Sequence, residues 1–330
     1  MLLRIFKNNN TAGFLLIPLI TVLAWLPGLR RDAVQQMVFD IHPMPLYRLV
    51  INYVDVNSLL ATLLAIVIVL IIGFYLIKFN STYNVLREKS LLPTFLFLLF
   101  ISCIPVLHRL SPALLSMVFF IPALDKLLAS YKTERLSYNY FEASFLIGAG
   151  SLMYFNLIYY IILVWVALFI LRPVIWREWI FSILGVITPW FFYVSGYFLL
   201  HDTIKPVQEL VIAKFTVTDP SRFIFLPEII YFSYLLILII VASRHITNSM
   251  PKMKVLSRKI YVLFFWTWAL SVVLYLLIET ANIELIVFAA IPVSFLLSHY
   301  ILFLRSGFWS NLFLWVIMAG TLILAWFPGY

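Results

Sequence analysis

The sequence predicts an all-α integral membrane protein with about eleven membrane-spanning helices. Of its 330 residues, 64% are hydrophobic and 11% are charged, whereas a soluble globular chain carries roughly 25% charged residues. The mean hydropathy of +1.04 and the long apolar runs also indicate a chain that lies mostly in lipid. This composition excludes a soluble enzyme and a disordered chain. The net charge of +9 needs no nucleic-acid partner, because the membrane topology accounts for it.

The apolar segments follow one another with charged or polar connections between them. A helix needs roughly 20 residues to cross the hydrocarbon layer, and most of the segments approach that length. The two segments between residues 142 and 171 are the shortest. We expect spans near residues 12–27, 57–77, 92–107, 113–129, 142–155, 157–171, 179–199, 228–243, 260–278, 285–304 and 310–327.

The short pair at 142–155 and 157–171 is either a hairpin that turns at Asn156 or one long tilted helix. A hairpin, with the N-terminus inside, leaves seven of the 23 Lys and Arg residues outside and 16 inside. One merged helix gives 11 inside and 12 outside. Because Lys and Arg concentrate in cytoplasmic loops, the hairpin is favoured, with a cytoplasmic N-terminus and an extracytoplasmic C-terminus. The seven outer residues are Arg30, Arg31, Arg48, Arg109, Lys205, Lys214 and Arg222.

Chemical motifs within the spans are sparse. Acidic residues such as Asp125, Glu142 and Glu284 lie near segment ends, which argues against a proton-driven pump. The single cysteine, Cys103, permits no intrachain disulfide. The chain contains no Walker loop, dinucleotide-binding glycine pattern, His-Glu-x-x-His or Gly-x-Ser-x-Gly. Any water-side chemistry is therefore expected in the loops, and no metal site is predicted.

Two predicted outer loops are long enough for such chemistry, at about 28–56 and 200–227. In the first, apolar residues from Leu46 to Val54 repeat at helical spacing, which predicts an amphipathic helix in the membrane interface. In the second, a weaker pattern around Leu210 indicates another such helix. The two loops together carry most of the outer charged side chains.

Three short motifs stand out along the chain: Arg-Ile-Phe-Lys-Asn-Asn-Asn at 4–10, Met-Pro-Leu-Tyr at 44–47, and Arg-Pro-Val-Ile-Trp-Arg-Glu-Trp at 172–179, followed by Gly185 and Pro189. With these motifs the chain resembles an uncharacterised family of polytopic membrane proteins from Bacteroidota. The resemblance covers nearly the whole chain. It implies a multi-pass protein of the bacterial inner (cytoplasmic) membrane with no assigned function.

The layout also resembles a small member of the GT-C glycosyltransferase class. Those enzymes take sugars from polyprenyl-phosphate carriers and place a catalytic acid in a long outer loop just after the first span. Asp32 lies five residues past Pro27, and the stretch from Asp40 to Tyr47 is similar to the His-Pro-Pro-Leu-Tyr of some members. The chain departs from the class because Arg31-Asp32-Ala33 replaces the paired acids of many members. No soluble acceptor-binding domain follows.

This second resemblance implies an envelope-glycan enzyme at the outer face of the inner membrane, with catalytic and phosphate-binding side chains in the outer loops. A carboxylate there can orient or deprotonate an acceptor hydroxyl, and basic residues can hold a lipid phosphate. The cofactor stays open, a divalent metal included. Expected partners are membrane lipids, a polyprenyl-phosphate-linked sugar and other envelope membrane proteins. The implied catalytic residues are Asp32, Asp40 and His42, and the implied phosphate ligands are Arg30, Arg31, Arg48, Lys205 and Arg222.

Two other functions fit the same sequence. A non-catalytic subunit or scaffold of an envelope complex accounts for the sparse catalytic motifs. A lipid or glycan transporter is the third possibility, although the charge-free spans argue against ion coupling. Under either alternative, Asp32 serves as a helix cap or a partner of Arg31, His42 is an ordinary loop residue, and Arg222 is a solvated charge.

Overall fold

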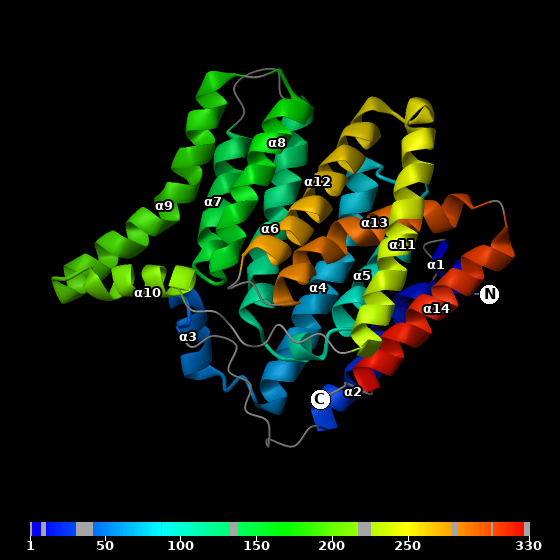
Figure 1. Cartoon of the computed structure of the whole chain (residues 1–330), viewed down its shortest axis with the longest axis horizontal. Coiled ribbons are helices and arrows are strands. Elements are labelled where there is room, and N and C mark those ends of the chain that lie inside the picture. Colours follow the sequence, from blue (N-terminus) through cyan, green and yellow to red (C-terminus); the bar gives the residue numbers. More distant parts are fainter. Residues whose placement is uncertain are drawn as a thin grey trace.

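A computed structural model of the chain is an all-helical bundle, as the composition predicts (Figure 1). It describes residues 2–7, 11–30, 42–86, 88–132, 138–173, 175–216, 226–278, 283–304 and 306–326. Throughout these ranges the backbone forms helices and connections, without a β-strand.

The helices occupy most of the described chain. The α-helices are α1 (Leu2–Lys7), α2 (Thr11–Arg30), α3 (Pro45–Tyr53), α4 (Leu59–Tyr83), α5 (Leu92–Ser102), α6 (Pro112–Ala129), α7 (Asn139–Ser151), α8 (Ile161–Leu171), α9 (Trp176–His201), α10 (Lys205–Thr216), α11 (Leu226–Ser249), α12 (Val255–Leu277), α13 (Ile286–Phe303) and α14 (Gly307–Trp326). Short 3-10 helices are η1 (Pro105–His108), η2 (Ser130–Lys132), η3 (Phe155–Tyr160), η5 (Met250–Lys252) and η6 (Ile283–Leu285).

Each of the eleven expected spans corresponds to a helix. Within the described residues, eight helices are long and apolar enough to cross a membrane, namely α2, α4, α6, α9, α11, α12, α13 and α14. Of the other three expected spans, α5 has 11 residues, α7 has 13, and α8 continues η3. The chain is therefore a multi-pass helical membrane protein by the length and composition of its helices, and the count of eleven crossings stays a prediction.

Helix α5 is shorter than the predicted span 92–107 because a proline follows it. The residue before a proline is restricted to extended backbone, and Ile104, with φ −107° and ψ 101°, precedes Pro105. All residues of α5 are buried, and α13 is also largely buried. An apolar helix of this length is typical of a protein core. Helices α5 and α13 therefore form the centre of the bundle, with the other long helices around them.

Contacts sort the connections into two ends of the bundle. At one end, Lys7 pairs with Glu88 at 3.3 Å, and the Lys259 Nζ donates to the Leu171 carbonyl at 2.8 Å. At the other, the Trp326 Nε1 donates to the Leu23 carbonyl at 3.2 Å. We call these the inner end and the outer end, after the predicted topology. The topology itself, and the side that faces the cytoplasm, remain predictions.

The predicted hairpin lies a few residues earlier than expected. Helix α7 ends at Ser151 and the chain turns at Leu152–Tyr154, where Tyr154 N donates to the Gly150 carbonyl at 3.0 Å. The turn therefore precedes Asn156, and η3 and α8 then lead back toward the inner end. There, the buried side chains of Arg172 and Glu178 form an ion pair of 3.0 Å between α8 and α9.

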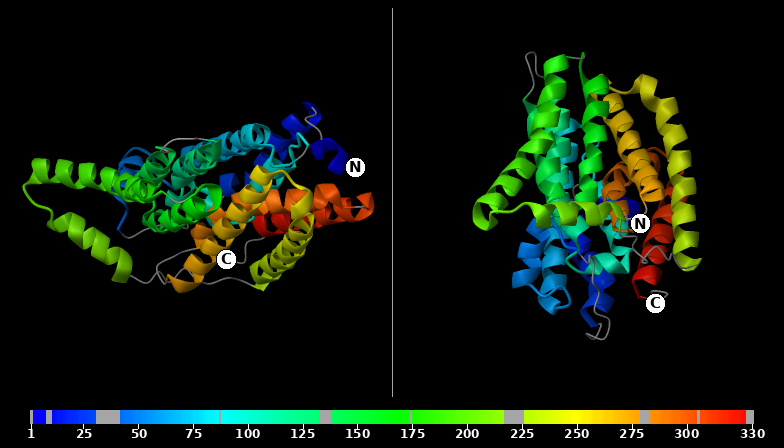
Figure 2. Two further views of the ribbon diagram at one scale, coloured as in Figure 1. Left: turned by 90° about the horizontal axis from the view of Figure 1, so that it is seen from above. Right: turned by 60° about the vertical axis from the view of Figure 1, so that its left-hand side comes forward.

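Helix α9 is held by α7 in its first half and leaves the bundle in its second. A Cβ atom built on Gly185 would lie 2.5 Å from the Phe141 carbonyl oxygen, so only glycine permits this approach. Pro189 follows, where the intrahelical hydrogen bonding is interrupted. Beyond it, the end of α9 and α10 form an arm that extends from the bundle and returns to it, where the Phe215 ring lies 5.4 Å from that of Phe155 (Figures 1 and 2).

Candidate functional site

Helix α3 carries the first part of the candidate site and is fixed to the outer end of the bundle. Pro45 occupies its first turn, where a missing N–H costs nothing. Met44 and Tyr47 are buried, and the Tyr47 hydroxyl donates to the Leu110 carbonyl at 3.2 Å. The backbone N–H of Leu46 donates to the Leu152 carbonyl at 3.0 Å. The predicted helix is thus confirmed, whereas its position in the membrane interface stays a prediction. Its contacts through Tyr47 fix the positions of the neighbouring residues.

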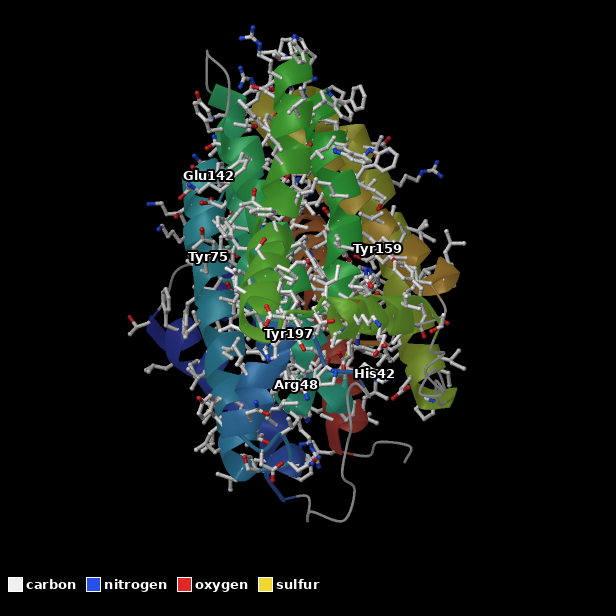
Figure 3. The ribbon with its side chains drawn as sticks, turned by 90° about the vertical axis from the view of Figure 1, so that its left-hand side faces the viewer. His42, Arg48, Tyr75, Glu142, Tyr159 and Tyr197 are labelled. Carbon is white, nitrogen blue, oxygen red and sulfur yellow. The ribbon has the colours of Figure 1, made fainter. Side chains whose placement is uncertain are left out.

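Two of the predicted site residues, His42 and Arg48, line one cavity at the outer end. Figure 3 shows them close together, with Tyr197 of α9 above them. The cavity has a volume of about 270 Å³, and its opposite wall is Pro206, Glu209 and Leu210 of α10. We call it the outer pocket. It joins the first long outer loop to the second, which are separated by more than 150 residues in the sequence.

The outer pocket combines three kinds of polar group. His42, Arg48 and Glu209 are all exposed, so water and a ligand can reach them. An imidazole and a carboxylate can each accept or donate a proton, and a guanidinium can bind a phosphate through two hydrogen bonds. The arrangement can therefore bind an anion beside a group that exchanges protons.

A row of rings leads from the bundle to the outer pocket along one face of α9. The centroid distances are 6.2 Å from Phe155 to Trp190, 6.5 Å from Trp190 to Tyr193, 6.2 Å from Tyr193 to Tyr197 and 4.2 Å from Tyr197 to His201. Tyr193 lies near enough to Arg48 for the guanidinium charge to act on its hydroxyl group. Rings with one apolar body and one polar tip suit the boundary between lipid and water. This aromatic row runs from Phe155 of η3 along one face of α9 to His201.

The remaining predicted site residues are placed only in part. Lys205 begins α10 and is exposed beside Pro206, outside the pocket lining. Arg30 ends α2, and its side chain lies outside the described residues, as do Arg31, Asp32, Asp40 and Arg222. The structure therefore brings together His42 and Arg48 and leaves the other predicted catalytic residues untested.

Sequence reasoning missed that Glu209 lines the outer pocket and that aromatic side chains form a row on α9. Glu209 was one of several charges in a loop with a weak helical pattern, and nothing local pairs it with Arg48. The tyrosines at 193 and 197 fall at helical spacing with Trp190, which indicates a shared face but not what that face borders. Within the described residues, no group of three or more His, Cys, Asp or Glu could hold a metal ion.

Residues from each of the motifs behind the first resemblance make contacts within the bundle. Phe6 is buried and stacks on Phe95 at 4.0 Å, Tyr47 anchors α3, and Glu178 pairs with Arg172.

One family model matches the chain over residues 34–328, and its description is a family of unknown function, DUF6427. The match includes the outer pocket and the motifs at 44–47 and 172–179, and it begins after the motif at 4–10. No curated protein and no solved structure matches the chain.

Proposed function

We propose that this chain, which belongs to the DUF6427 family of unknown function, is an envelope-glycan enzyme of the bacterial inner membrane. In this proposal it is a polyprenyl-phosphate-sugar-dependent glycosyltransferase with a GT-C-like layout. It acts at the outer face of the membrane, with eleven crossings and a cytoplasmic N-terminus.

One observation carries the proposal. The outer pocket draws a cation and an imidazole from the first outer loop and a carboxylate from the second, His42 and Arg48 against Glu209. The pocket lies at a bundle end, and the aromatic row on α9 leads toward it from the apolar part of the chain. A donor with a long apolar chain and a phosphate at its head matches such an arrangement.

The proposed reaction follows from the chemistry of these groups. Glu209 or His42 takes the proton from the acceptor hydroxyl, whose oxygen forms a bond to the anomeric carbon of the sugar. The bond from that carbon to the phosphate oxygen breaks, and polyprenyl phosphate leaves with the electron pair. Arg48 holds that phosphate and stabilises its growing charge. The site thus separates proton removal from leaving-group stabilisation.

The predicted residues that do not line the outer pocket keep their proposed roles; of these, Lys205 is described and exposed, and the side chains of the others lie outside the described residues. Asp32 and Asp40 are further acids of the first loop, and either can serve as the base instead of Glu209. Arg30, Arg31, Lys205 and Arg222 are further phosphate ligands. Their variants belong in the same experiments.

Transfer from a synthetic polyprenyl-phosphate hexose tests the proposal on the purified full-length protein. Arg48→Gln removes a charge-assisted hydrogen bond and is expected to weaken binding of polyprenyl phosphate about tenfold or more. Glu209→Gln is expected to retain the lipid and to lower transfer by roughly 10²–10⁴-fold. Lys214→Gln on the same helix, outside the pocket, is the matched control. The proposal fails if Glu209→Gln, His42→Gln, Asp32→Ala and Asp40→Ala all leave transfer unchanged.

A non-catalytic subunit of an envelope complex is the second candidate, and the projecting arm favours it. Phe191 and Phe192 are 62% and 67% exposed, and Leu199 and Leu200 are 79% and 81% exposed. Such an apolar surface fits another membrane helix as well as it fits lipid. This candidate predicts a stoichiometric partner that is lost when Leu199 and Leu200 are changed to serine, and full function of Arg48→Gln and Glu209→Gln.

A further inference from the structure

A second polar cavity lies at the inner end of the bundle, opposite to the proposed glycan site. It has a volume of about 400 Å³, within the roughly 300–1,000 Å³ of small-ligand sites. Three parts of the chain that are distant in sequence form it: the end of α4, the connection from α11 to α12 together with the first turn of α12, and α13. We call it the inner pocket; its lining residues are Asn84, Val85, Lys252, Met253, Lys254, Ser257 and His299.

The walls of the inner pocket are held by hydrogen bonds between these segments. Asn84 has left-handed backbone (φ 46°) and ends α4. Its carbonyl accepts a hydrogen bond from the Ser257 hydroxyl at 3.3 Å, and the Val85 carbonyl accepts one from Tyr261 at 3.3 Å. The backbone carbonyls of Asn84 and Val85 are thus already engaged by α12. The connection after α4 is fixed against α12 as one wall.

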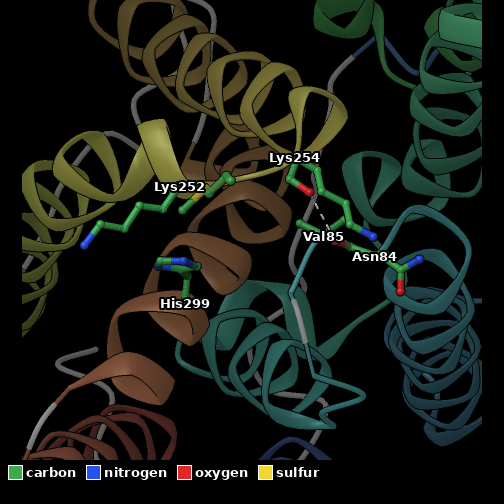
Figure 4. Close-up of a pocket in the computed structure, with 7 residues that line it drawn as sticks. Asn84, Val85, Lys252, Lys254 and His299 are labelled. Carbon is green, nitrogen blue, oxygen red and sulfur yellow. Dashed lines mark hydrogen bonds between the residues drawn. The ribbon is translucent and has the colours of Figure 1, made fainter.

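The polar groups of the inner pocket are mostly donors and cations. Lys252 and Lys254 are exposed, whereas His299 is buried at 6% exposure in the floor. Figure 4 shows the two lysines on either side of His299, with Lys254 extending toward Asn84. Lys254 is the N-cap residue of α12, and its side chain makes no capping hydrogen bond. None of the seven lining residues is acidic, so the charge of the cavity is positive.

The N-terminus of α12 adds to this charge. The first turn of a helix presents backbone N–H groups without intrahelical partners, together with the positive end of the helix dipole. Lys254 and Ser257 belong to this turn and both line the cavity. A lysine ammonium on a flexible stem can swing onto an anion that these N–H groups hold. The two lysines and the N-terminus of α12 therefore both favour a negatively charged ligand in the cavity.

We propose that the inner pocket binds a phosphate group, supplied by the head of an anionic phospholipid from the leaflet at this end. Basic pockets between membrane helices on the cytoplasmic side are typical sites for such headgroups. The connection between α11 and α12 joins two candidate spans, and in the proposed topology it lies at the height of the headgroups. A soluble phosphate compound offers the same chemistry, and the experiment below separates the two sources.

Lipid retention on the full-length protein tests the proposal. The protein is purified in mild detergent with phosphatidylglycerol or phosphatidylcholine at equal concentration, and bound lipids are counted by native mass spectrometry. Each lysine near an anionic surface contributes roughly a fivefold change in affinity. The double variant Lys252→Gln/Lys254→Gln is therefore expected to lose about 25-fold in phosphatidylglycerol affinity. Lys78→Gln/Lys89→Gln, with the same net charge at the same end and outside the pocket, is the control and is expected to retain it.

Inorganic phosphate and glycerol phosphate form the second arm. If they stabilise the unsubstituted protein against heat in phosphatidylcholine, and not Lys252→Gln/Lys254→Gln, the pocket is a phosphate site with a soluble source. If phosphatidylglycerol alone does so, the source is the lipid. Equal loss of phosphatidylglycerol from both double variants overturns the proposal, because general surface charge then explains the binding. The proposal is also overturned if both double variants keep their phosphatidylglycerol and phosphate does not stabilise the unsubstituted protein against heat.

Discussion

The contact between α7 and α9 yields a sharp prediction, because two glycines of one helix differ only in their surroundings. In Gly185→Ala, the new Cβ would lie 2.5 Å from the Phe141 carbonyl oxygen and 2.7 Å from the Ser144 Cβ. The carbonyl is backbone of α7 and cannot rotate away. Gly196, eleven residues further along α9, has no atom within 4 Å of the same position. Gly196→Ala is therefore a matched control.

The magnitudes follow from packing and helix propensity. Alanine is favoured over glycine in a helix by up to about 1 kcal/mol, and both variants gain this term. Overpacking costs about 1–3 kcal/mol, and only Gly185→Ala incurs it. Thermal unfolding in detergent should therefore rank Gly196→Ala at or above the unsubstituted protein and Gly185→Ala below it, with about 1–3 kcal/mol between the variants. Equal stability of the two variants would refute the close approach of α7 and α9, and with it the position of the arm.

Two further predictions concern the inner ion pair and the number of crossings. Arg172→Met removes the ion pair of the fully buried Glu178 carboxylate and should lower the free energy of unfolding by about 3–5 kcal/mol. The double variant Arg172→Met/Glu178→Leu should recover most of that stability in thermal unfolding. If the losses of the two substitutions simply add, the pairing is contradicted. In a Cys103→Ala background, Tyr53→Cys and Asp202→Cys should both react with a membrane-impermeant maleimide from the same side. Reaction from opposite sides would show that 142–171 crosses only once.

The helices could be predicted from the sequence because an apolar run and its breakers are local features. The stripe from Leu46 to Val54 predicts α3, and α3 is there, fixed by the buried Tyr47. The end of α5 is also local in cause, since Pro105 restricts Ile104. The expected span 92–107 nevertheless extended past it, because hydropathy alone does not register the backbone restriction.

Only the side of the outer pocket that the first loop supplies could be predicted from the sequence. The resemblance singled out His42 and Arg48, and both line the cavity. Their partner, Glu209, depends on how far α9 leaves the bundle and how α10 returns beneath it. That geometry follows from the glycine contact at 185 and the proline at 189, whose effect is expressed only after α7 and α9 have packed. Long-range packing of this kind has no periodic pattern in the chain.

Mass spectrometry of the lipids that co-purify with the protein tests the central proposal most directly. The proposal predicts that polyprenyl phosphate, or its glycosylated form, accompanies the unsubstituted protein and Lys214→Gln, and that Arg48→Gln retains about tenfold less. Bulk phospholipid alone in all three preparations, together with a stoichiometric protein partner, would contradict it. The outer pocket would then be part of a scaffold rather than of an enzyme.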